Sequence, residues 1–355
     1  MPAQRPSVPA SNWGLTPVDR HPGIRALAWA GDVLYASCGY ELLRGSACDG
    51  RFEWHTFARF QPPLWRAVTC KARLSSRLLR DGFHALAVLA SGQLVGAIPG
   101  AIVTLRPGET EFHATLKISR GTRPLHIAAT PEGQLFFGEY FDNPDRGEVH
   151  IYGSSNRGES WHIAHTFPKG AIRHVHNIAH DPWENCLWIL TGDYGTECRV
   201  LRASCDLKTI DVAMSGNQQA RAVAVVPAPE GLYFSSDTPL EANHVYHLDR
   251  QGNLSTLSDL ESSSIYGCRV GDAIFFTTMV EPSEINETRS VHLYGSHAPG
   301  EWRPLCEWKK DRWSMRFFQY GNALLPDGAN STPYLAVSTV AVERDDLVTT
   351  IFKVN

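Results

Sequence analysis

The sequence predicts an all-β fold, a seven-bladed β-propeller, with six blades as the alternative. Three observations lead to this prediction: the chain consists of similar passes of short strands, its hairpin turns recur at a regular spacing, and no helix of any length is required. The chain has 355 residues, of which 43% are hydrophobic, and a closed all-β fold can use this length as one domain. We expect residues 1–24 to form an N-terminal extension and closing strand, and residues 25–355 to form a single propeller.

The stretch RGEVHIYGSSNRGESWHIAHTF, residues 146–167, shows the repeated element most clearly. Val149, Ile151 and Tyr152 form a short β-type run, and a second run returns from Trp161 to Phe167. Two such runs joined by a polar turn that contains glycine are typical of a β-hairpin.

The turn of this hairpin has the pattern Ser154-X-Asn156-X-Gly158-X-Ser160-Trp161. The pattern resembles the Asp-box, or BNR repeat, of sialidase-like β-propellers, with Asn in place of Asp and Ser in place of Thr. Asn156 can bind the backbone of its own turn, and Gly158 can adopt a positive φ. The resemblance implies a structural turn, far from the face that carries the active site.

The repeats follow one another along the chain in seven passes. Weaker copies of the turn begin at Ser204, Asp249 and Ser296, so the steps from Ser154 are 50, 45 and 47 residues. A period of this size is typical of four-stranded propeller blades. Residues 59–80 fit no blade strand and are predicted to be an insertion. The passes begin at Arg25, Arg80, Arg123, Arg173, Arg221, Ile265 and Arg316.

Charge and composition argue against several classes of partner. The net charge is −4 and the chain has no long Lys/Arg run, so we expect no nucleic-acid partner. No run approaches the roughly 20 apolar residues of a membrane span, and we expect no membrane partner. The eight cysteines lack zinc-type spacing, and the N-terminus lacks the apolar core of a secretion signal, so we expect reduced thiols and a cytoplasmic location.

Polar residues recur where loops would meet at one mouth of the central channel, the usual place for binding sites. The loops that follow the second strands of three successive blades supply Glu139 with Tyr140, Asp193, and Asp237. The loops that lead into inner strands supply the remaining candidates, Arg123, His126, Arg173, His174, His176, Gln218 and Arg221.

Two interpretations of these residues stay open. In one, the arginines and acids form a neutral network that joins adjacent blades, because buried charges must be paired. In the other, they form a glycan pocket in which substrate binds to Arg123, Arg173, Arg221, Gln218 and Asp237. Catalysis in that pocket would then be performed by His126, His176, Tyr140, Glu139 and Asp193.

No cofactor is required by the sequence, but a divalent metal ion is possible. His126, His174 and His176 are the candidate ligands, together with nearby carboxylates. His174 and His176 lie two residues apart and share one face of a strand, as His180 would unless the strand bulges or ends first.

The Asp-box resemblance implies a carbohydrate-active protein, because sialidases, other propeller glycosidases and several polysaccharide lyases are similar. The expected substrate is an acidic saccharide of the uronate or sialate kind, cleaved by a hydrolase or a lyase. A lyase would need His126 or His176 as base, Tyr140 as acid, and Arg173 or Arg221 to neutralise the carboxylate. Hydrolysis would use two carboxylates among Glu139, Asp193 and Asp237. A non-catalytic propeller that binds glycans or proteins is the alternative.

Overall fold

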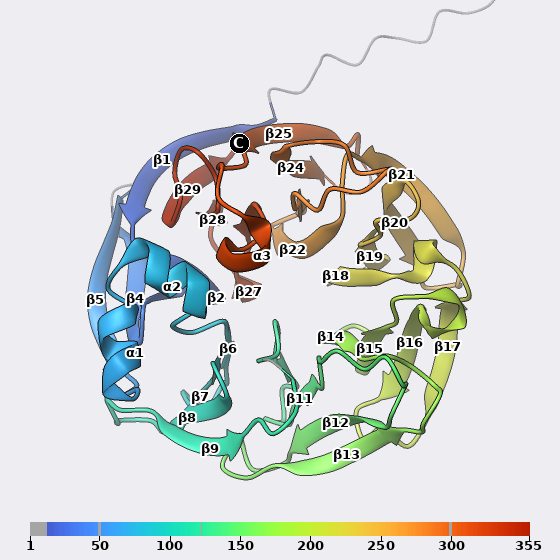
Figure 1. Cartoon of the computed structure of the whole chain (residues 1–355), viewed down its shortest axis with the longest axis horizontal. Coiled ribbons are helices and arrows are strands. Elements are labelled where there is room, and N and C mark those ends of the chain that lie inside the picture. Colours follow the sequence, from blue (N-terminus) through green and yellow to red (C-terminus); the bar gives the residue numbers. More distant parts are fainter. Residues whose placement is uncertain (1–12, 49–50, 122, 298–299) are drawn as a thin grey trace, which may run out of the picture.

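The computed structural model describes residues 13–48, 51–121, 123–297 and 300–355, and it confirms the predicted fold. Seven small antiparallel sheets stand in a ring around a central axis, so the protein is an all-β, seven-bladed propeller (Figure 1). The predicted extension lies outside the described residues for its first 12 positions.

Each of the first six blades is made of four consecutive strands, which run from the axis to the rim. Blade one has β2 (Arg25–Gly31), β3 (Val33–Cys38), β4 (Glu41–Cys48) and β5 (Arg51–Arg59), and blade two has β6 (Ala85–Val88), β7 (Leu94–Ile98), β8 (Ala101–Leu105) and β9 (His113–Lys117). Blade three has β10 (Ala128–Ala129), β11 (Leu135–Gly138), β12 (Val149–Ser154) and β13 (His162–Phe167), and blade four has β14 (Val175–Asp181), β15 (Cys186–Thr191), β16 (Arg199–Ser204) and β17 (Ile210–Ser215). Blade five has β18 (Ala222–Ala228), β19 (Gly231–Ser236), β20 (Asn243–Asp249) and β21 (Leu254–Leu260), and blade six has β22 (Ser264–Val270), β23 (Ala273–Thr278), β24 (Ser290–His297) and β25 (Arg303–Lys309).

The seventh blade joins the two ends of the chain. It contains β26 (Asn322–Leu324), β28 (Tyr334–Val340), β29 (Val348–Val354) and, outermost, β1 (Leu15–Pro22). β1 is antiparallel to β29, with Leu15 opposite Val354, so a strand from the start of the chain closes the ring. A further strand, β27 (Asp327–Asn330), pairs in parallel with the inner strand β2 of blade one.

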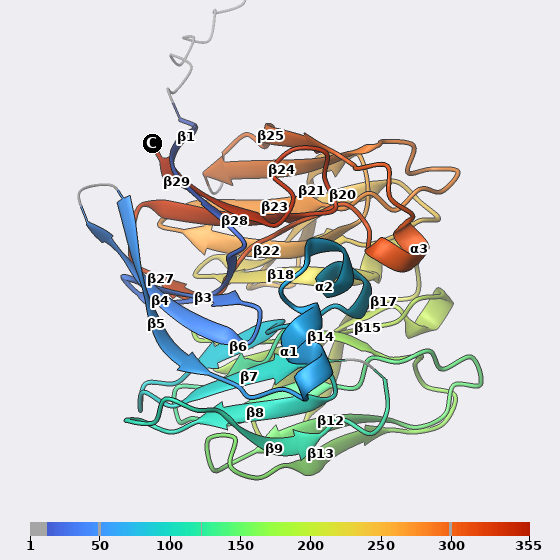
Figure 2. The same cartoon turned by 60° about the vertical axis from the view of Figure 1, so that its left-hand side comes forward.

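In the described part of the chain, three short α-helices lie outside the blades, and two 3-10 turns, η1 (Gly195–Glu197) and η2 (Gln218–Ala220), precede strands of blades four and five. α1 (Leu64–Thr69) and α2 (Arg73–Leu79) occupy the insertion that the sequence predicted, and α3 (Met315–Phe318) precedes β26. All three belong to segments that lead into an inner strand, and strand direction alternates within each blade. They therefore lie on the same face as the other loops that lead into inner strands, and Figure 2 shows them together on one side of the ring.

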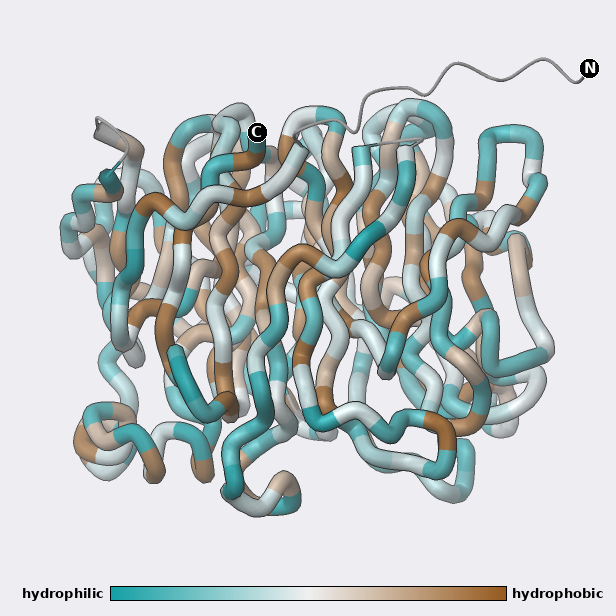
Figure 3. The backbone as a smooth tube through the Cα atoms, turned by 90° about the horizontal axis from the view of Figure 1, so that it is seen from above, coloured by the Kyte–Doolittle hydropathy of each residue, from teal (hydrophilic) through white to brown (hydrophobic). Residues whose placement is uncertain are grey.

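The hydrophobic core lies between neighbouring blades. Phe136 and Ile151 of blade three, for example, pack with Ile178, Leu187 and Leu201 of blade four in one buried cluster. Figure 3 shows hydrophobic residues in the strands and hydrophilic residues in many of the turns at both faces of the ring. This packing of sheet on sheet gives a rigid frame for the loops at the mouth.

The Asp-box-like turn between β12 and β13 has the hydrogen bonds that the residue types predict. Asn156 Oδ1 accepts from Ser154 Oγ (2.9 Å) and from Ser160 N (3.0 Å), and Ser154 Oγ accepts from Gly158 N (2.9 Å). The Trp161 ring packs on Phe137, with the ring centroids 5.2 Å apart. Because Thr104 of blade two donates to Gly158 O, the turn also fastens blade three to blade two.

Replacing Gly158 by alanine is expected to lower the free energy of unfolding by about 2–4 kcal/mol. Gly158 has φ +85°, and an added Cβ would lie 2.6 Å from Val95 Cγ2 of blade two. Gly170 is the matched control, because its φ is +87° but no atom lies within 4 Å of the added Cβ. Denaturant unfolding of both variants checks the prediction. Equal losses of unfolding free energy would show that the turn is not tightly packed against blade two.

Candidate functional site

The polar residues that the structure brings together lie at the mouth of the channel on the helix-bearing face. They come from the loops and strand ends of blades three, four and five, and we call them the mouth cluster. Its members are Tyr140, Arg173, His174, His176, Asp193, Arg221 and Asp237.

Asp193 is the centre of the mouth cluster. Its Oδ1 lies 3.2 Å from His176 Nε2 and 3.5 Å from His174 Nε2. Arg173 Nη1 lies 3.3 Å from Oδ2, and Arg221 Nη2 lies 3.4 Å from Oδ1. Burial raises the pKa of Asp193, but the close contacts of its carboxylate with His174 and His176 outweigh burial and hold the pKa well below its ordinary value. Asp193 is therefore ionised at neutral pH.

The two histidines have fixed tautomers. His176 Nδ1 lies 2.9 Å from the carbonyl oxygen of Ala222, and His174 Nδ1 lies 3.1 Å from that of Phe141. A carbonyl oxygen only accepts hydrogen bonds, so Nδ1 carries the hydrogen in both rings. Burial lowers the pKa of His176, which favours the neutral ring. In the neutral rings, both Nε2 atoms present lone pairs, 3.0 Å apart, towards each other and towards Asp193.

Three acceptor atoms thus converge on one point. Their separations of 3.0–3.5 Å are those expected around an ion with bonds of about 2.1 Å, where octahedral or tetrahedral ligands lie about 3.0–3.4 Å apart. His174, His176 and Asp193 therefore fit a divalent cation such as Zn²⁺ or Mn²⁺. A second group of potential ligands, Asp181, Glu184 and Cys186, differs because Arg250 pairs with both of its carboxylates.

A second carboxyl group, that of Asp237, also contacts Nη2 of Arg221. Arg221 Nη2 is 3.8 Å from Asp237 Oδ2 and 3.4 Å from Asp193 Oδ1, so the two carboxyl oxygens are at most about 7 Å apart. Burial raises the pKa of Asp237 to about 7, helped by Glu281 and Asp193 and opposed by Arg221. Neighbouring acids with pKa values shifted in opposite directions are typical of acid/base pairs in active sites.

Tyr140 forms the outer wall of the mouth cluster. Its ring packs on His174, with centroids 4.3 Å apart, and the residue is 38% exposed. Desolvation of the hydroxyl, then the charges of Asp237 and Asp193, raise its pKa to about 12. Tyr140 is therefore protonated at neutral pH and suited to donate a proton.

Glu139 and Gln218, two of the predicted site residues, bind other parts of the propeller and stabilise its fold. Glu139 is buried, pairs with Arg120, and accepts from His150 N (2.8 Å). It follows β11, where successive side chains point to opposite sides, so it faces away from Tyr140. Gln218 donates to Asp193 O (2.9 Å) and accepts from Thr238 (2.7 Å), so its amide holds the loop.

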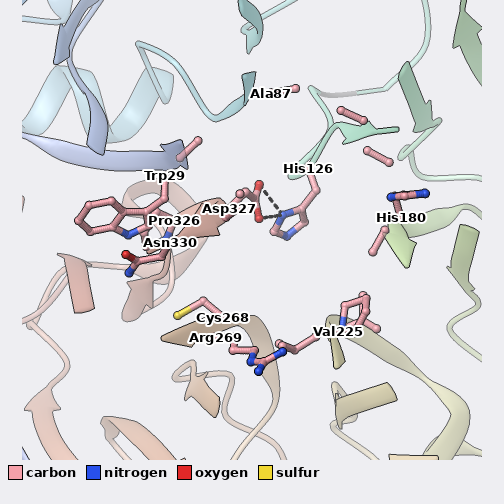
Figure 4. A pocket seen from close by; sticks show the side chains of 18 of the residues that line it. Trp29, Ala87, His126, His180, Val225, Cys268, Arg269, Pro326, Asp327 and Asn330 are labelled. Carbon is pink, nitrogen blue, oxygen red and sulfur yellow. Dashed lines mark hydrogen bonds and ion pairs between the residues drawn. The ribbon is translucent and has the colours of Figure 1, made fainter. Parts of the chain in front are cut away.

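The predicted grouping of His126 with His174 and His176 is wrong. His126 lies in the axial channel, where its Nδ1 is 2.8 Å from Asp327 Oδ1 and 3.0 Å from Oδ2 (Figure 4). Blade three has an inner strand of only two residues, Ala128–Ala129, so His126 precedes the strand while His176 lies within β14. Arg123-X-X-His126 and Arg173-X-X-His176 have the same spacing in the sequence, but their histidines therefore take different positions in the two blades.

The axial channel contains a cavity of about 680 Å³, lined by the inner strands and the turns that follow them. His180, which follows a bulge in β14 between Val175 and Asn177, lines this cavity. His126 Nε2 and Asn177 Oδ1 are buried, and neither has a hydrogen-bond partner among the described residues.

Arg123 belongs to a basic group on the other side of the mouth. Burial, followed by the charges of Arg80 and Arg25, lowers its pKa to about 9. Arg25 donates from Nη1 to His84 Nδ1 (3.1 Å), while His84 Nε2 donates to Arg80 O (2.8 Å). Burial and the nearby arginines lower the pKa of His84 well below its ordinary value, so this ring stays neutral. Arg123 is therefore separate from Arg173 and Arg221.

Sequence reasoning missed Glu281, whose charge helps to raise the pKa of Asp237 and whose Oε2 accepts from Ser263 (2.8 Å). Its position in the repeat could have identified Glu281 as a site residue, because it follows the second strand of blade six just as Asp193 and Asp237 follow those of blades four and five. It also missed Asp142, which pairs with Arg173, and Asp327.

Comparisons with known proteins support the fold alone. No protein-family model matches the chain, and no curated protein matches its sequence. Among solved structures, one similar chain belongs to "Crystal Structure of Mitotic Checkpoint Complex", with a TM-score of 0.58 and 12% sequence identity over 100% of this chain and 97% of that chain. Identity this low shows a shared β-propeller fold and carries no activity with it.

Proposed function

We propose that the protein is a carbohydrate-active enzyme that cleaves glycosidic bonds of an acidic saccharide at the mouth cluster. The observation that carries the proposal is the arrangement around Arg221. This guanidinium lies between an ionised carboxylate, Asp193, and a carboxyl with a pKa near 7, Asp237, beside the exposed tyrosine Tyr140.

Arg173 and Arg221 are the groups that would bind the acidic function of the sugar. Guanidinium groups recognise carboxylates through paired, charge-assisted hydrogen bonds. Arg173 is about one fifth exposed and lies beside the ring of Tyr194, which is itself exposed and offers a face to a sugar ring. These residues would place the carboxylate of a uronate or sialate unit over Asp193 and Asp237.

For a uronate, β-elimination fits this geometry best. Asp237 would remove the proton next to the carboxylate, the C–O bond to the leaving sugar would break, and a C=C bond would form. Tyr140 would protonate the leaving oxygen. A base with a pKa near the working pH and an acid that stays protonated are what general acid–base catalysis needs. The histidines are not suited as bases, because both rings are buried, Nδ1 of each ring binds a backbone carbonyl, and each Nε2 faces the other ring and Asp193.

Hydrolysis is the second candidate, favoured by the separation of the two carboxyls. A distance of at most about 7 Å between Asp193 and Asp237 is compatible with glycosidase carboxyl pairs. In that reaction Asp237 would be the general acid and Asp193 or Glu281 the carboxylate. A divalent cation held by His174, His176 and Asp193 would supply positive charge to neutralise the substrate carboxylate in either reaction.

The test is a panel of uronate-containing, sialylated and neutral glycans, incubated with the full chain with and without a chelator. Lyase action gives an unsaturated product that absorbs in the near ultraviolet and is lighter than the hydrolysis product by one water molecule. We expect cleavage of an acidic glycan and none of the neutral ones. Binding without cleavage would favour the non-catalytic alternative, and neither binding nor cleavage would refute the proposal.

Replacing Arg221 by glutamine is expected to lower kcat/KM on the acidic glycan by about 100-fold, because one charge-assisted contact is lost. Arg106→Gln is the matched control, because Arg106 is exposed and pairs with Glu159 outside the mouth cluster. Equal activity of both variants would exclude Arg221 from substrate binding.

A further inference from the structure

Exposed hydrophobic side chains gather on the three helices beside the mouth. Among the described residues, 17 large hydrophobic side chains are exposed, and eight of them fall in two short segments. Five belong to α1 and α2, namely Leu64, Trp65, Val68, Leu74 and Leu78. Three belong to α3 or its flanks, namely Trp313, Phe317 and Tyr320. We call these eight residues the helix patch.

The helix patch is a preformed surface, because buried contacts fix α2 against α3. Arg77 is 1% exposed and donates from Nη1 to Asp311 Oδ2 (2.6 Å). Its Nε donates to Phe318 O (3.2 Å) at the end of α3. Arg66 of α1 pairs with Asp81, just beyond α2. The helices are thus held in place by polar contacts on their inner side, which leaves the apolar side chains pointing outwards.

Positive charge surrounds the helix patch. Residues 59–80 contain six Lys or Arg residues and no Asp or Glu. Several of these charges are paired internally, but Lys71, Arg312 and Arg316 are exposed and form no ion pair with another described residue. Short helices that combine protruding Leu, Val and Trp with Lys and Arg are typical of surfaces that insert into the interface of an anionic membrane.

We propose that the helix patch binds the surface of a membrane that contains anionic lipids. This proposal is independent of the proposed function. No described helix is long and apolar enough to cross a membrane, so the contact is peripheral. The expectation of no membrane partner considered only a spanning segment, which surface binding does not need.

Two other partners, a second copy of the chain and a sugar chain, fit the helix patch less well than a membrane does. A second copy of the chain would bring two basic segments against each other, and like charges across an interface oppose association. A sugar chain would stack on Trp65 and Trp313, but it would leave the aliphatic Leu64 and Val68, 87% and 69% exposed, without an apolar partner. Lipid acyl chains cover aliphatic side chains, and Trp and Tyr favour the headgroup level.

The test is co-sedimentation of the full chain with phosphatidylcholine vesicles, and with vesicles in which a third of that lipid is replaced by phosphatidylserine. We expect the chain to bind only the anionic vesicles strongly, and binding to weaken with added salt. Leu64→Glu with Val68→Glu is expected to weaken binding about tenfold or more, as is Lys71→Glu with Arg312→Glu. Leu254→Glu with Leu257→Glu is the control, because both residues are exposed on β21, outside the helix patch.

Wild-type binding that is equal on neutral and anionic vesicles would overturn the proposal, as would full binding by the Leu64 and Val68 variant. An equal loss in the β21 control would also overturn it, by showing that any added acid weakens binding. Light scattering covers the remaining alternative: a wild-type dimer that becomes a monomer in the Leu64 and Val68 variant would identify a second copy as the occupant. Circular dichroism of each variant verifies folding, which is expected because all substituted residues are exposed.

Discussion

Replacing Asp237 by asparagine is expected to lower turnover of the acidic saccharide about 100-fold or more and, at pH 8, to stabilise the protein. The loss of turnover follows because the amide cannot exchange a proton at a pH near 7, where the carboxyl can. The gain in stability follows because the ionised carboxylate is costly in this buried place, close to Glu281 and Asp193.

The direction of the pH dependence is fixed by the raised pKa of Asp237. The ordinary value is 3.8 and the value in the folded protein is about 7, so between these values the folded protein holds a proton that the unfolded chain has lost. The stability linked to this proton is complete below about pH 4 and is lost as the pH rises through 7. Asp237→Asn should therefore change stability little at pH 4 and raise it by about 2–4 kcal/mol at pH 8.

Thermal and denaturant unfolding at pH 4 and pH 8, in the presence of a chelator, measure this difference. Asp259→Asn is the matched control, because this carboxylate is 92% exposed and lies outside the mouth cluster. If Asp237→Asn is inactive but more stable at pH 8, Asp237 is needed for catalysis and not for the stability of the fold. If Asp237→Asn is instead less stable at pH 8, Asp237 is a paired structural charge, as in the interpretation of the cluster as a neutral network.

The fold could be predicted from the sequence because its signals are local and repeated. A turn of the Ser-X-Asn-X-Gly type is recognisable within eight residues, and the step of about 47 residues between turns is a property of the chain alone. The clustering of Arg173, His176 and Asp193 was predictable because it is local: all three belong to blade four, where the start of the inner strand and the end of the second strand lie at the same face.

The rest of the site depends on contacts between distant parts of the chain. His126 turns towards Asp327, 201 residues away, on a strand that joins blade one in parallel and breaks the repeat. The separation of Glu139 from Tyr140 follows from strand alternation and could have been predicted. The separation of Arg123 from Arg173 could not have been predicted, because the two residues begin their repeats in the same way but have different neighbours in the folded protein.

Replacing His176 by alanine is expected to reduce the affinity for a divalent cation at least about 100-fold, because one of three converging ligands is lost. In the wild-type chain, Zn²⁺ or Mn²⁺ at 100 times its dissociation constant should stabilise folding by about 2.7 kcal/mol. Calorimetric titration and thermal unfolding measure both effects. His150→Ala is the control, because His150 lies on β12 and bonds to Thr166, away from Asp193.

This experiment decides between two ways of balancing the same charges. Arg173 and Arg221 supply two positive charges, while Asp193, Asp237 and Glu281 supply up to three negative ones, so the fully ionised cluster has room for a cation. If the wild-type chain binds no divalent cation, a proton must balance the charge instead, either on Asp237 or shared between the two Nε2 atoms and Asp193. Loss of cation binding in His176→Ala, with binding retained in His150→Ala, assigns the three acceptors to a metal.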